Sequence, residues 1–572
     1  MGAVAPSPRR IPAGADPWLR RDRSRRRAAY VAAAIGAVGL LSALSRPLRG
    51  RLAAVLDVVP VVVPTTAVLT LVFVSFALLL TALGLRRGHR LAWVVAELLL
   101  FASVMLHVTK GLDVEEAAMA AAAVIWLGLR RRAFPVLPSQ AAAARAVVVG
   151  VCGTVAVVVV SLVLAQMARG VGEVDDFVGL VLRDLGGAGR VPPPFTGRFA
   201  AVVLAAMGLA LLGSVAWLLF SPRVPEPLVG EDHRRERERA RSVVLRYGGG
   251  TLDYFALRDD KQWFFTGSSV VAHSVRGSIC LVSPDPIGPA EEARETWADF
   301  TAHAERSGWS VAVLGAAEDW LGIYEASGLR PVYLGDEAVV DCITFKLEGH
   351  AMQSVRRAHR RVRAAGYTIA FHGTADLDPA TRAELLGLAG QSRRGEGERG
   401  FSMTLSRLFD PADTGVVVAV ARDAAGRAQA FSQWVPATKL PGWSLDVMRR
   451  SMAPDLPNGI MDFLIVETIW WVRQAGGTAL GLNFAVGRRI VAGDNGVTAT
   501  ARLARQLLRR ASNNMQIESL WRFNAKYGPR WVPRFAAVGT LDLLAGQGLA
   551  MADAEGLTEL PLVGRMVGRA PR

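Results

Sequence analysis

The sequence reads Trp443-Ser-Leu-Asp-Val-Met-Arg-Arg-Ser-Met-Ala-Pro-Asp-Leu-Pro-Asn-Gly-Ile-Met-Asp-Phe-Leu-Ile-Val-Glu467 where β-type periodicity gives way to helical periodicity. Apolar and polar side chains alternate over 443–448, which is typical of a strand. The turn Pro457-Asn-Gly459 leads into a helix that we expect over 461–474, and the short apolar run 479–483 predicts another strand. A strand, a crossover helix and a second strand in this order indicate a fold that mixes helices and sheet.

The same alternation extends outward over residues 245–560. We predict further strands at 254–257, 263–265, 269–275, 278–282, 309–314, 339–346, 367–372, 415–421 and 428–436, with helices at 291–307, 318–327, 352–365, 379–392 and 501–511. The order of the elements recurs about halfway along. The fold class that we expect is therefore α+β, with two tandem units at 245–370 and 371–560 and the chemistry in the second.

Long apolar runs are concentrated before residue 222. Each is near the length that crosses the hydrocarbon core of a bilayer, so we predict a helical membrane domain over 28–222. Its six candidate spans are 28–46, 62–85, 91–109, 115–130, 144–167 and 198–220. A basic tail at 1–27, which we expect to be disordered, precedes this domain, and a charged linker at 223–244, helical from Glu231, follows it.

Basic residues follow the second, fourth and sixth predicted spans, and acidic residues follow the third and fifth. The positive-inside rule then places both ends of the chain and everything after the linker in the cytoplasm, as a multi-pass membrane protein. Arg46, Arg49 and Arg51 conflict with this topology, because they would lie outside.

Composition narrows the possible partners. The formal net charge is +16, which favours anionic partners such as nucleic acid or anionic lipid headgroups, although basic cytoplasmic loops explain part of it. The three cysteines, Cys152, Cys280 and Cys342, have no zinc-ligand spacing with one another or with histidine. No phosphate-binding P-loop and no Ser-His-Asp nucleophile elbow is present, so we expect neither a metal nor a cofactor.

The opening stretch supplies most of the candidate chemical groups. Asp446 lies on the predicted strand, and Arg449 and Arg450 follow three and four residues later. Asp462 lies early in the following helix, and Glu467 follows about a turn and a half later. Asp446 and Arg449 can equally form a structural ion pair, and an acid early in a helix also stabilises the positive end of its dipole.

A charged, glycine-rich loop, Gly397-Glu-Arg-Gly-Phe-Ser-Met403, offers Glu398 and Arg399 as substrate-binding groups. A mobile loop over a site fits this composition, and a plain surface loop fits it equally well. Its glycines do not have the spacing of a loop that cradles the pyrophosphate of acetyl-CoA, and it follows a helix rather than a strand.

Arginines recur at Arg356, Arg360 and Arg363 on one face of a predicted helix, where they can bind tRNA or lipid phosphates or form a solvated surface. The run Glu518-Ser-Leu-Trp-Arg-Phe-Asn-Ala-Lys-Tyr-Gly-Pro-Arg-Trp-Val-Pro-Arg-Phe535 places Arg522, Lys526 and Arg534 among aromatic side chains. Cations beside aromatic rings suit a phosphate and a stacked base, and a buried terminal strand with surface arginines is the alternative.

Six ordered motifs across about 245–540 resemble the C-terminal domain of bacterial phosphatidylglycerol lysyltransferases, the multiple peptide resistance factors. They are Tyr254-Phe-Ala-Leu257, Ser283-Pro-Asp-Pro-Ile-Gly288, Arg399-Gly-Phe-Ser-Met403, Leu445-Asp-Val-Met-Arg449, Asn458-Gly-Ile-Met-Asp462, and Arg522-Phe-Asn-Ala-Lys-Tyr527 with Trp531-Val-Pro-Arg534. The resemblance implies two tandem GNAT-type folds that form a tunnel between a tRNA-facing opening and the membrane. It also implies transfer of an aminoacyl group, lysyl by family, from aminoacyl-tRNA to phosphatidylglycerol, and resistance to cationic antimicrobial peptides.

Under this hypothesis Asp446 and Asp462 hold the aminoacyl ammonium and Arg449 grips the lipid phosphate. Lys526 and Arg534 steady the tRNA 3′ end and the transition state. The expected partners are aminoacyl-tRNA, phosphatidylglycerol and the bilayer, and a homo-oligomer is left open. Two alternatives stand beside this one: an aminoacyl-tRNA-dependent transferase with another acceptor, such as a peptidoglycan precursor or another lipid, and a non-catalytic membrane anchor that binds anions.

Overall fold

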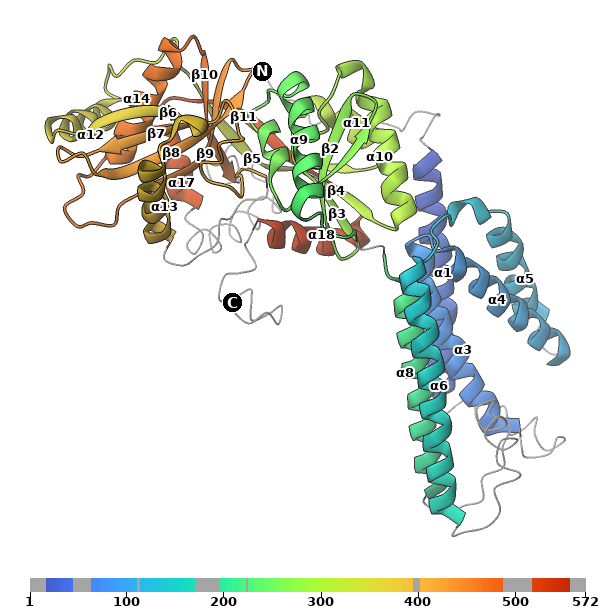
Figure 1. The fold of residues 1–572 in the computed structure, drawn as a ribbon. Helices are drawn as coiled ribbons and strands as arrows, with labels where there is room; N and C mark the ends of the chain where they lie inside the picture. Colours follow the sequence, from blue (N-terminus) through green and yellow to red (C-terminus); the bar gives the residue numbers. More distant parts are fainter. Residues whose placement is uncertain are drawn as a thin grey trace. The chain divides into compact units, whose positions relative to one another are not determined.

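The computed structural model describes residues 17–44, 63–110, 114–169, 196–222, 225–393, 402–486 and 517–555. The chain divides into two compact units (Figure 1). The first comprises Met1–Val224 with Ala302–Trp309, and the second comprises Pro225–Thr301 with Ser310–Arg572. We describe each unit by itself.

The first unit is helical. Its described helices are α1 (Pro17–Leu44), α3 (Val63–Arg86), α4 (Arg90–Lys110), α5 (Val114–Gly128), α6 (Gln140–Arg169) and α8 (Thr196–Phe220). Helix α1 packs along α3, α4 along α5, and α6 along α8. Small residues such as Ala92, Ala96 and Gly84 lie where these helices meet, and a methyl group on Gly84 would collide with Ala92 Cβ at 2.5 Å. Close helix packing therefore depends on these small side chains.

Each of the six predicted spans overlaps one of these helices, but only two stretches in the described residues are long and apolar enough to cross a membrane. They are Gln140–Val163 in α6 and Val203–Phe220 in α8. Six spans therefore remain a prediction. The predicted disordered tail at 1–27 is wrong in its second part, because α1 begins at Pro17; the arginines of 20–27 share a helix with the alanines that follow.

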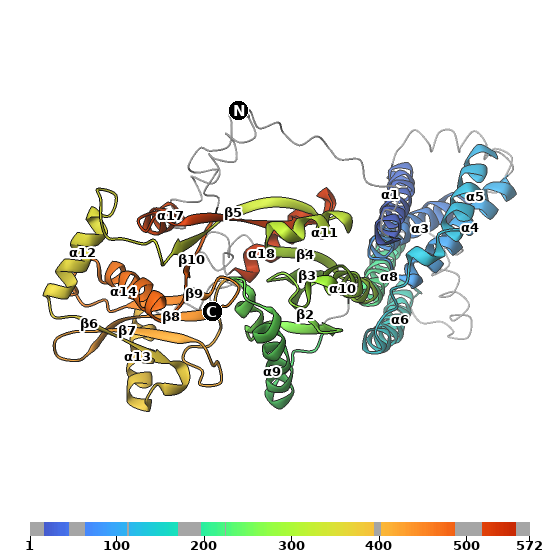
Figure 2. The ribbon, with the colours of Figure 1, turned by 90° about the horizontal axis from the view of Figure 1, so that it is seen from above.

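The second unit is built on one eleven-stranded mixed sheet (Figures 1 and 2). Its strands are β1 (Gln262–Thr266), β2 (Ser269–Arg276), β3 (Ile279–Val282), β4 (Ser310–Ala316), β5 (Arg330–Asp341), β6 (Thr368–Gly373), β7 (Val417–Arg422), β8 (Ala428–Ala437), β9 (Gly442–Arg450), β10 (Ala479–Val486) and β11 (Arg530–Val538). Their order across the sheet is β1-β2-β3-β4-β11-β5-β10-β9-β8-β7-β6. The predicted α+β class is confirmed for this unit.

The helices of this unit are α9 (Gly230–Tyr247), α10 (Ala293–Ser307), α11 (Leu321–Ala326), α12 (Gln353–Ala364), α13 (Pro379–Arg393), α14 (Ile460–Gln474), α17 (Ile517–Ala525) and α18 (Leu541–Ala554). The expected helix in the linker is confirmed by α9. The predicted strand at 254–257 is wrong: Asp253–Leu257 is a 3₁₀ helix whose apolar side chains are all buried. A short apolar run does not by itself distinguish a strand from a buried helical turn. The predicted helix at 501–511 lies outside the described residues.

The sheet has the same arrangement on both sides of its centre. β3 and β4 are parallel and are joined by α10; β9 and β10 are parallel and are joined by α14. Antiparallel strands flank each parallel pair on the outside, and β11 and β5 lie between the two pairs. This arrangement fits two tandem units of one type, as the sequence predicts.

The predicted boundary at 370 does not separate the two halves. Helix α12, which was expected in the first unit, packs against α14 in the second, and the C-terminal strand β11 lies between β4 and β5 of the first. The whole of the sheet lies in one compact unit. The first half therefore contains a strand, β11, from near the C-terminal end of the chain.

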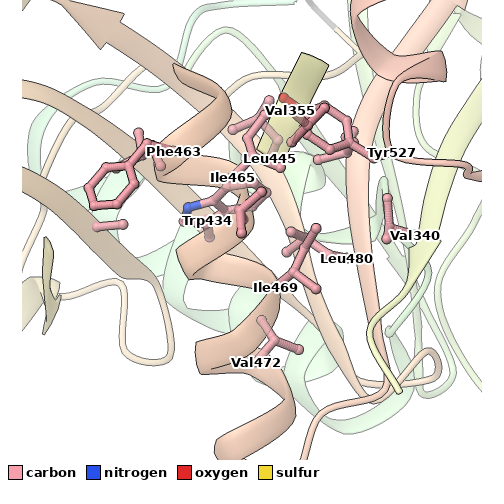
Figure 3. Close-up of a cluster of buried hydrophobic side chains, with 14 of the residues drawn as sticks. Val340, Val355, Trp434, Leu445, Phe463, Ile465, Ile469, Val472, Leu480 and Tyr527 are labelled. Atoms are coloured by element: carbon pink, nitrogen blue, oxygen red, sulfur yellow. The ribbon is translucent and has the colours of Figure 1, made fainter. Parts of the chain in front are cut away.

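The largest core cluster lies between α14, α12 and the strands β5, β8, β9 and β10 (Figure 3). Trp434, Phe463, Ile465 and Leu480 are almost completely buried in it. Burying such a side chain contributes about 1.5–3 kcal/mol. This core fixes the position of α14 on the sheet, and with it the position of the first turn of α14.

Candidate functional site

The parallel strands β9 and β10 pair over only three positions. Ala479 faces Gly442, Leu480 faces Trp443 and Gly481 faces Ser444. Beyond Ser444, β9 continues to pair with β8 as far as Arg450, while β10 continues along β5. Helix α14 follows β9 in the chain, so its N-terminus lies toward the carboxyl ends of these strands. Ligands of sheets with parallel strands bind at such an end, where neighbouring strands separate.

Three residues meet at the N-terminus of α14. Tyr527 Oη donates a 2.7 Å hydrogen bond to Asp462 Oδ1, and Lys526 Nζ lies 3.2 Å from the same oxygen. Tyr527 is buried in the core, as Figure 3 shows, and burial raises its pKa, so the hydroxyl keeps its proton. Lys526 is about one-third exposed and also lies over the ring of Phe523 at 4.7 Å. The cluster thus presents an accessible ammonium group held in place by a buried carboxylate.

Local backbone chemistry explains why Asp462 stands there. Gly459 caps α14 with φ at 98°, a left-handed conformation that favours glycine. A methyl group on Gly459 would come within 2.5 Å of Ala358 Cβ on α12, so both the backbone and the packing require glycine. Asp462 then falls in the first turn of the helix, where the helix dipole stabilises a negative charge.

Asp446 lies in different surroundings. The register between β8 and β9 shifts there, because Gln433 faces Val447 while Trp434 faces Leu445. Asp446 accepts 2.7 Å hydrogen bonds from the Gln433 side chain and from the backbone of Leu405. Gln433 Oε1 in turn accepts a hydrogen bond from the backbone of Phe409. The buried Asp446 therefore ties the 402–409 segment to the sheet.

Arg534 is buried in an ion pair. Its Nε and Nη2 donate to Glu337 Oε2 at 3.1 and 2.9 Å, and Nη2 also donates to Thr251 Oγ1 at 3.0 Å. β11 and β5 are neighbours, and this diagonal pair joins them across the centre of the sheet. The prediction that Arg534 holds a tRNA phosphate does not fit this position, because its guanidinium is buried and already paired.

At the corresponding end of the first parallel pair, β3 and β4, a buried carboxylate links the segments that follow the two strands. Asp285 follows β3, and its two oxygens accept hydrogen bonds from the backbone of Ala317, after β4, at 2.8 Å and from Tyr324 Oη at 2.6 Å. Burial raises the pKa of Asp285 to about 6. At the second parallel pair, the N-terminus of α14 instead carries the partly exposed ion pair of Asp462 and Lys526.

The other predicted site residues lie apart from this cluster or outside the described residues. Glu467 pairs with His359 Nε2 at 2.9 Å, which joins α14 to α12. His359, on α12, is itself buried; its ring is tilted against Phe463 and lies edge-on to Trp470. Arg449 is half-buried, with Nη1 donating to the Met448 carbonyl, whereas Arg450 and Arg522 are exposed. The last two predicted residues, Glu398 and Arg399, fall outside the described part of the chain.

The arginines of α12 divide into two kinds. Arg356 donates to the carbonyls of Leu347 and Gly349 in the preceding loop, so it is a structural residue and the prediction of a phosphate contact does not fit it. Four others are exposed: Arg357, Arg360, Arg361 and Arg363. The opposite face, with Val355 and Val362, is buried against α14. No acidic residue occurs within α12.

Two participants were missed at the sequence level. Tyr527 directly follows Lys526, but nothing in the pattern shows that its hydroxyl reaches a residue 65 positions earlier. Glu337 lies in a run that reads as an ordinary strand, and its burial depends on the insertion of β11. The adjacent acids Asp336 and Glu337, which lie just before the apolar run that starts at Ala338, were the available signal. Among the described residues no group of three His, Cys, Asp or Glu side chains has the geometry of a metal site.

Comparison with known proteins shows which family the chain belongs to. Residues 241–538 match the family model described as phosphatidylglycerol lysyltransferase, C-terminal, which is more than half of the chain. The chain belongs to the phosphatidylglycerol lysyltransferase family. The family match contains every predicted site residue and both parallel strand pairs.

Named relatives of the family cover most of the chain. It is 34% identical over 514 residues to the lysylphosphatidylglycerol biosynthesis bifunctional protein LysX of Mycobacterium bovis (strain BCG / Pasteur 1173P2), and 34% identical over 515 residues to the protein of the same name from Mycobacterium avium (strain 104). Each match covers 85% of this chain and 43% of the relative. The chain thus spans less than half the length of these relatives.

Two solved structures are similar to a little over half of the chain. L-PGS from Bacillus licheniformis is 24% identical, and the match covers 56% of this chain and 96% of that one with a TM-score of 0.49. The C-terminal domain of a putative lysylphosphatidylglycerol synthetase from Agrobacterium fabrum is also 24% identical, and it covers 57% and 96% of the two chains with a TM-score of 0.48.

Proposed function

We propose that this protein transfers an aminoacyl group, lysyl by family, from aminoacyl-tRNA to a glycerol hydroxyl of phosphatidylglycerol. Membership of the phosphatidylglycerol lysyltransferase family and the relatives named for lysylphosphatidylglycerol biosynthesis support the reaction. Both the bond that breaks and the bond that forms are esters, so the exchange needs no input of free energy from a nucleotide.

The observation that carries the proposal is the cluster of Asp462, Lys526 and Tyr527 at the separated end of β9 and β10. In the reaction, the lipid hydroxyl oxygen attacks the ester carbonyl and the bond to the tRNA ribose oxygen breaks. The proton leaves the lipid hydroxyl and ends on the ribose oxygen. Negative charge develops on the carbonyl oxygen, and a positioned ammonium group beside it lowers the barrier.

Each member of the cluster has a role in this proposal. Lys526 stabilises the developing oxyanion, because its Nζ is accessible. Asp462 holds that ammonium group in position, and Tyr527 fixes the carboxylate through its own hydrogen bond. Asp446 acts indirectly by holding the 402–409 segment, while Arg449 remains our candidate for the lipid phosphate. Holding the reacting groups at fixed positions accounts for much of the rate enhancement in such transfers.

The membrane part of the proposal rests on the first unit. We infer that α6 and α8 cross the bacterial plasma membrane and that the other four helices complete a six-span domain with both termini in the cytoplasm. This topology keeps the second unit where aminoacyl-tRNA occurs and beside its lipid substrate. Lysylation of phosphatidylglycerol adds positive charge to an anionic surface, so we expect altered resistance to cationic peptides.

The direct test compares lipid extracts from cells with and without the gene by mass spectrometry. The proposal predicts an aminoacylated phosphatidylglycerol that disappears with the gene and returns when the gene is restored, and its mass identifies the amino acid. Restoration with a Lys526→Ala variant serves as the matched control. Identical lipid profiles in all strains would reject phosphatidylglycerol as the acceptor.

A further inference from the structure

Glu337 has an unused hydrogen-bond acceptor at the centre of the sheet. The residue is 1% exposed, and its Oε2 accepts both hydrogen bonds from Arg534. Its Oε1 is buried and has no hydrogen-bond partner among the described residues. Buried carboxylate oxygens are nearly always paired, because an unpaired one loses the hydrogen bonds that it would form with water.

The unpaired oxygen faces the place where β9 and β10 separate. A methyl group on Gly481 would lie 3.4 Å from Glu337 Oε1, 2.9 Å from Ser444 Oγ and 3.2 Å from Thr251 Cγ2. Gly481 and Ser444 form the last pair of the β9–β10 ladder. Gly481 therefore packs directly against all three groups, and an added methyl group would displace them.

Negative charge exceeds positive charge around Arg534. Three carboxylates act on this one guanidinium: Glu337, Asp285 and Asp253. Asp253 also accepts hydrogen bonds from the backbone of Gly249 and Gly250, and Asp285 from Ala317 and Tyr324. A buried region with such an excess of acids attracts a cation.

Asp446 and Asp462, the two acids predicted from the sequence to hold the aminoacyl ammonium group, already accept hydrogen bonds from other residues. Asp446 is occupied by Gln433 and Leu405, and Asp462 by Lys526 and Tyr527. A hydrogen bond links β10 to the segment that carries Lys526. Asn524 in α17 donates it to the carbonyl of Leu482, the residue after Gly481. Among these acids, Glu337 has an acceptor oxygen with no hydrogen-bond partner among the described residues.

We propose that Glu337 Oε1, beside Ser444 Oγ, binds a primary ammonium group of the aminoacyl substrate at the end of the β9–β10 ladder. This inference rests on the proposed transfer reaction. A lysyl substrate carries two such groups, the α-ammonium and the ε-ammonium, and both have the required chemistry. Neither Glu337 nor Ser444 takes part in bond making; their role is to bind the substrate.

The test measures binding of small amides to the purified full-length protein by calorimetry. The probes are lysinamide, Nα-acetyl-lysinamide, which lacks the α-ammonium, and norleucinamide, which lacks the ε-ammonium. Wild-type protein is expected to bind lysinamide, and the modified probe that still binds identifies which ammonium group Glu337 holds.

Two variants remove the site in independent ways. Glu337→Gln removes the charge, and Gly481→Ala adds a methyl group against Ser444 Oγ and Glu337 Oε1 without removing any charged group. Each is expected to weaken lysinamide binding by a factor of about 10 or more, as for loss of a charge-assisted hydrogen bond. The matched controls are Glu384→Gln, which alters an ion pair with Arg422 in another part of the unit, and Gly390→Ala, whose added methyl meets nothing within 4 Å.

Unchanged lysinamide affinity in both variants would overturn the inference, and so would the absence of binding to the wild-type protein. Thermal unfolding of Glu337→Gln shows whether that variant remains folded, and Gly481→Ala decides the matter if it does not. Lipid transfer is measured separately on the same preparations. A wild-type protein that binds lysinamide yet makes no aminoacyl lipid would reject the transfer reaction and leave the ammonium site standing.

Discussion

At the scale of single residues, Lys526 and Tyr527 are neighbours that share one acceptor. Both side chains reach Asp462 Oδ1, although one is partly exposed and the other is buried in the core. The buried tyrosine fixes the carboxylate, and the carboxylate fixes the ammonium group. This division between a rigid support and an accessible charge is what a site that stabilises an oxyanion requires.

Replacement of Lys526 tests that division. We expect Lys526→Ala to lower the transfer rate by about 10²- to 10³-fold, the cost typical of removing one oxyanion-stabilising donor. Stability should change little, because the side chain is partly exposed. Lys439→Ala is the control, since Lys439 is exposed and only its backbone makes a described hydrogen bond. Full activity of Lys526→Ala in a radiolabelled transfer assay would remove Lys526 from the mechanism.

Lys261 gives a prediction about pH. The ammonium group is completely buried, donates to the carbonyls of Phe255 and Ser283, and burial lowers its pKa from 10.5 to about 7. The folded protein thus releases this proton near pH 7, while the unfolded chain holds it up to its ordinary pKa. Because the unfolded chain binds more protons between these values, stability should rise with pH across this window.

The measurement is thermal unfolding of wild type and Lys261→Met at several pH values above about 7. The stability of wild type relative to the variant should increase by up to about 1.4 kcal/mol per pH unit. Parallel curves for the two proteins would show that Lys261 does not titrate in this range.

At the scale of elements, the two arginine-rich helices α9 and α12 differ in whether acidic residues neutralise their arginines. In α9 the arginines alternate with acids and form ion pairs on their own helix, such as Arg234 with Glu231 and Arg235 with Asp232. The exposed arginines of α12 have no acid within the helix. Its apolar face is buried against α14, so α12 cannot insert that face into a bilayer. We therefore favour tRNA phosphates as the partner of α12.

We expect Arg360→Ala with Arg363→Ala to weaken tRNA binding and to make it less dependent on salt. Loss of two phosphate contacts should reduce the slope of log affinity against log salt concentration by roughly 1.4 to 1.8. Filter binding at several salt concentrations measures both effects. The control is Arg234→Ala with Arg235→Ala on α9, and an equal effect from the control would reject α12 as the tRNA surface.

The pair of Arg534 on β11 and Glu337 on β5 gives an element-scale prediction about stability. Arg534→Met should destabilise the second unit by about 3–5 kcal/mol, because it leaves a buried carboxylate without its partner. The double variant Arg534→Met with Glu337→Met should recover most of that loss in thermal unfolding. A double variant no more stable than the single one would show that packing, and not charge, dominates at this position.

Sequence periodicity was sufficient for elements whose signal is local. The strand around Asp446 and the helix that starts at the Pro-Asn-Gly turn are confirmed by β9 and α14, because period and turn chemistry are carried by neighbouring residues. The run after Glu518 has no such local signal. It divides into α17 and β11, and β11 pairs with strands about 200 positions earlier in the sequence. Arg534 and Glu337, for example, are 197 residues apart. Nothing local specifies such a pairing.

At the scale of the whole molecule, the same long-range pairing decided which predicted residues could be right. Asp462 and Lys526 were predicted together and lie together. Arg534, Arg356 and Glu467 were chosen for their charge, but each is held by a partner that only the tertiary structure supplies. Charge in the sequence therefore indicated which acids and bases were candidates, while burial decided which of these charges remain accessible.

At the scale of the two units, the proposed function assigns each unit one task. The helical unit, with its apolar helices α6 and α8, holds the protein in the membrane, and the sheet unit supplies the accessible ammonium group of Lys526. The most direct test incubates the purified protein, in bilayers containing phosphatidylglycerol, with tRNA carrying radiolabelled lysine. We predict label in the chloroform-soluble lipid at the mass of lysylphosphatidylglycerol, and its loss in Lys526→Ala. Label that stays on tRNA or appears only as free lysine, with intact charged tRNA and folded protein, would contradict the account.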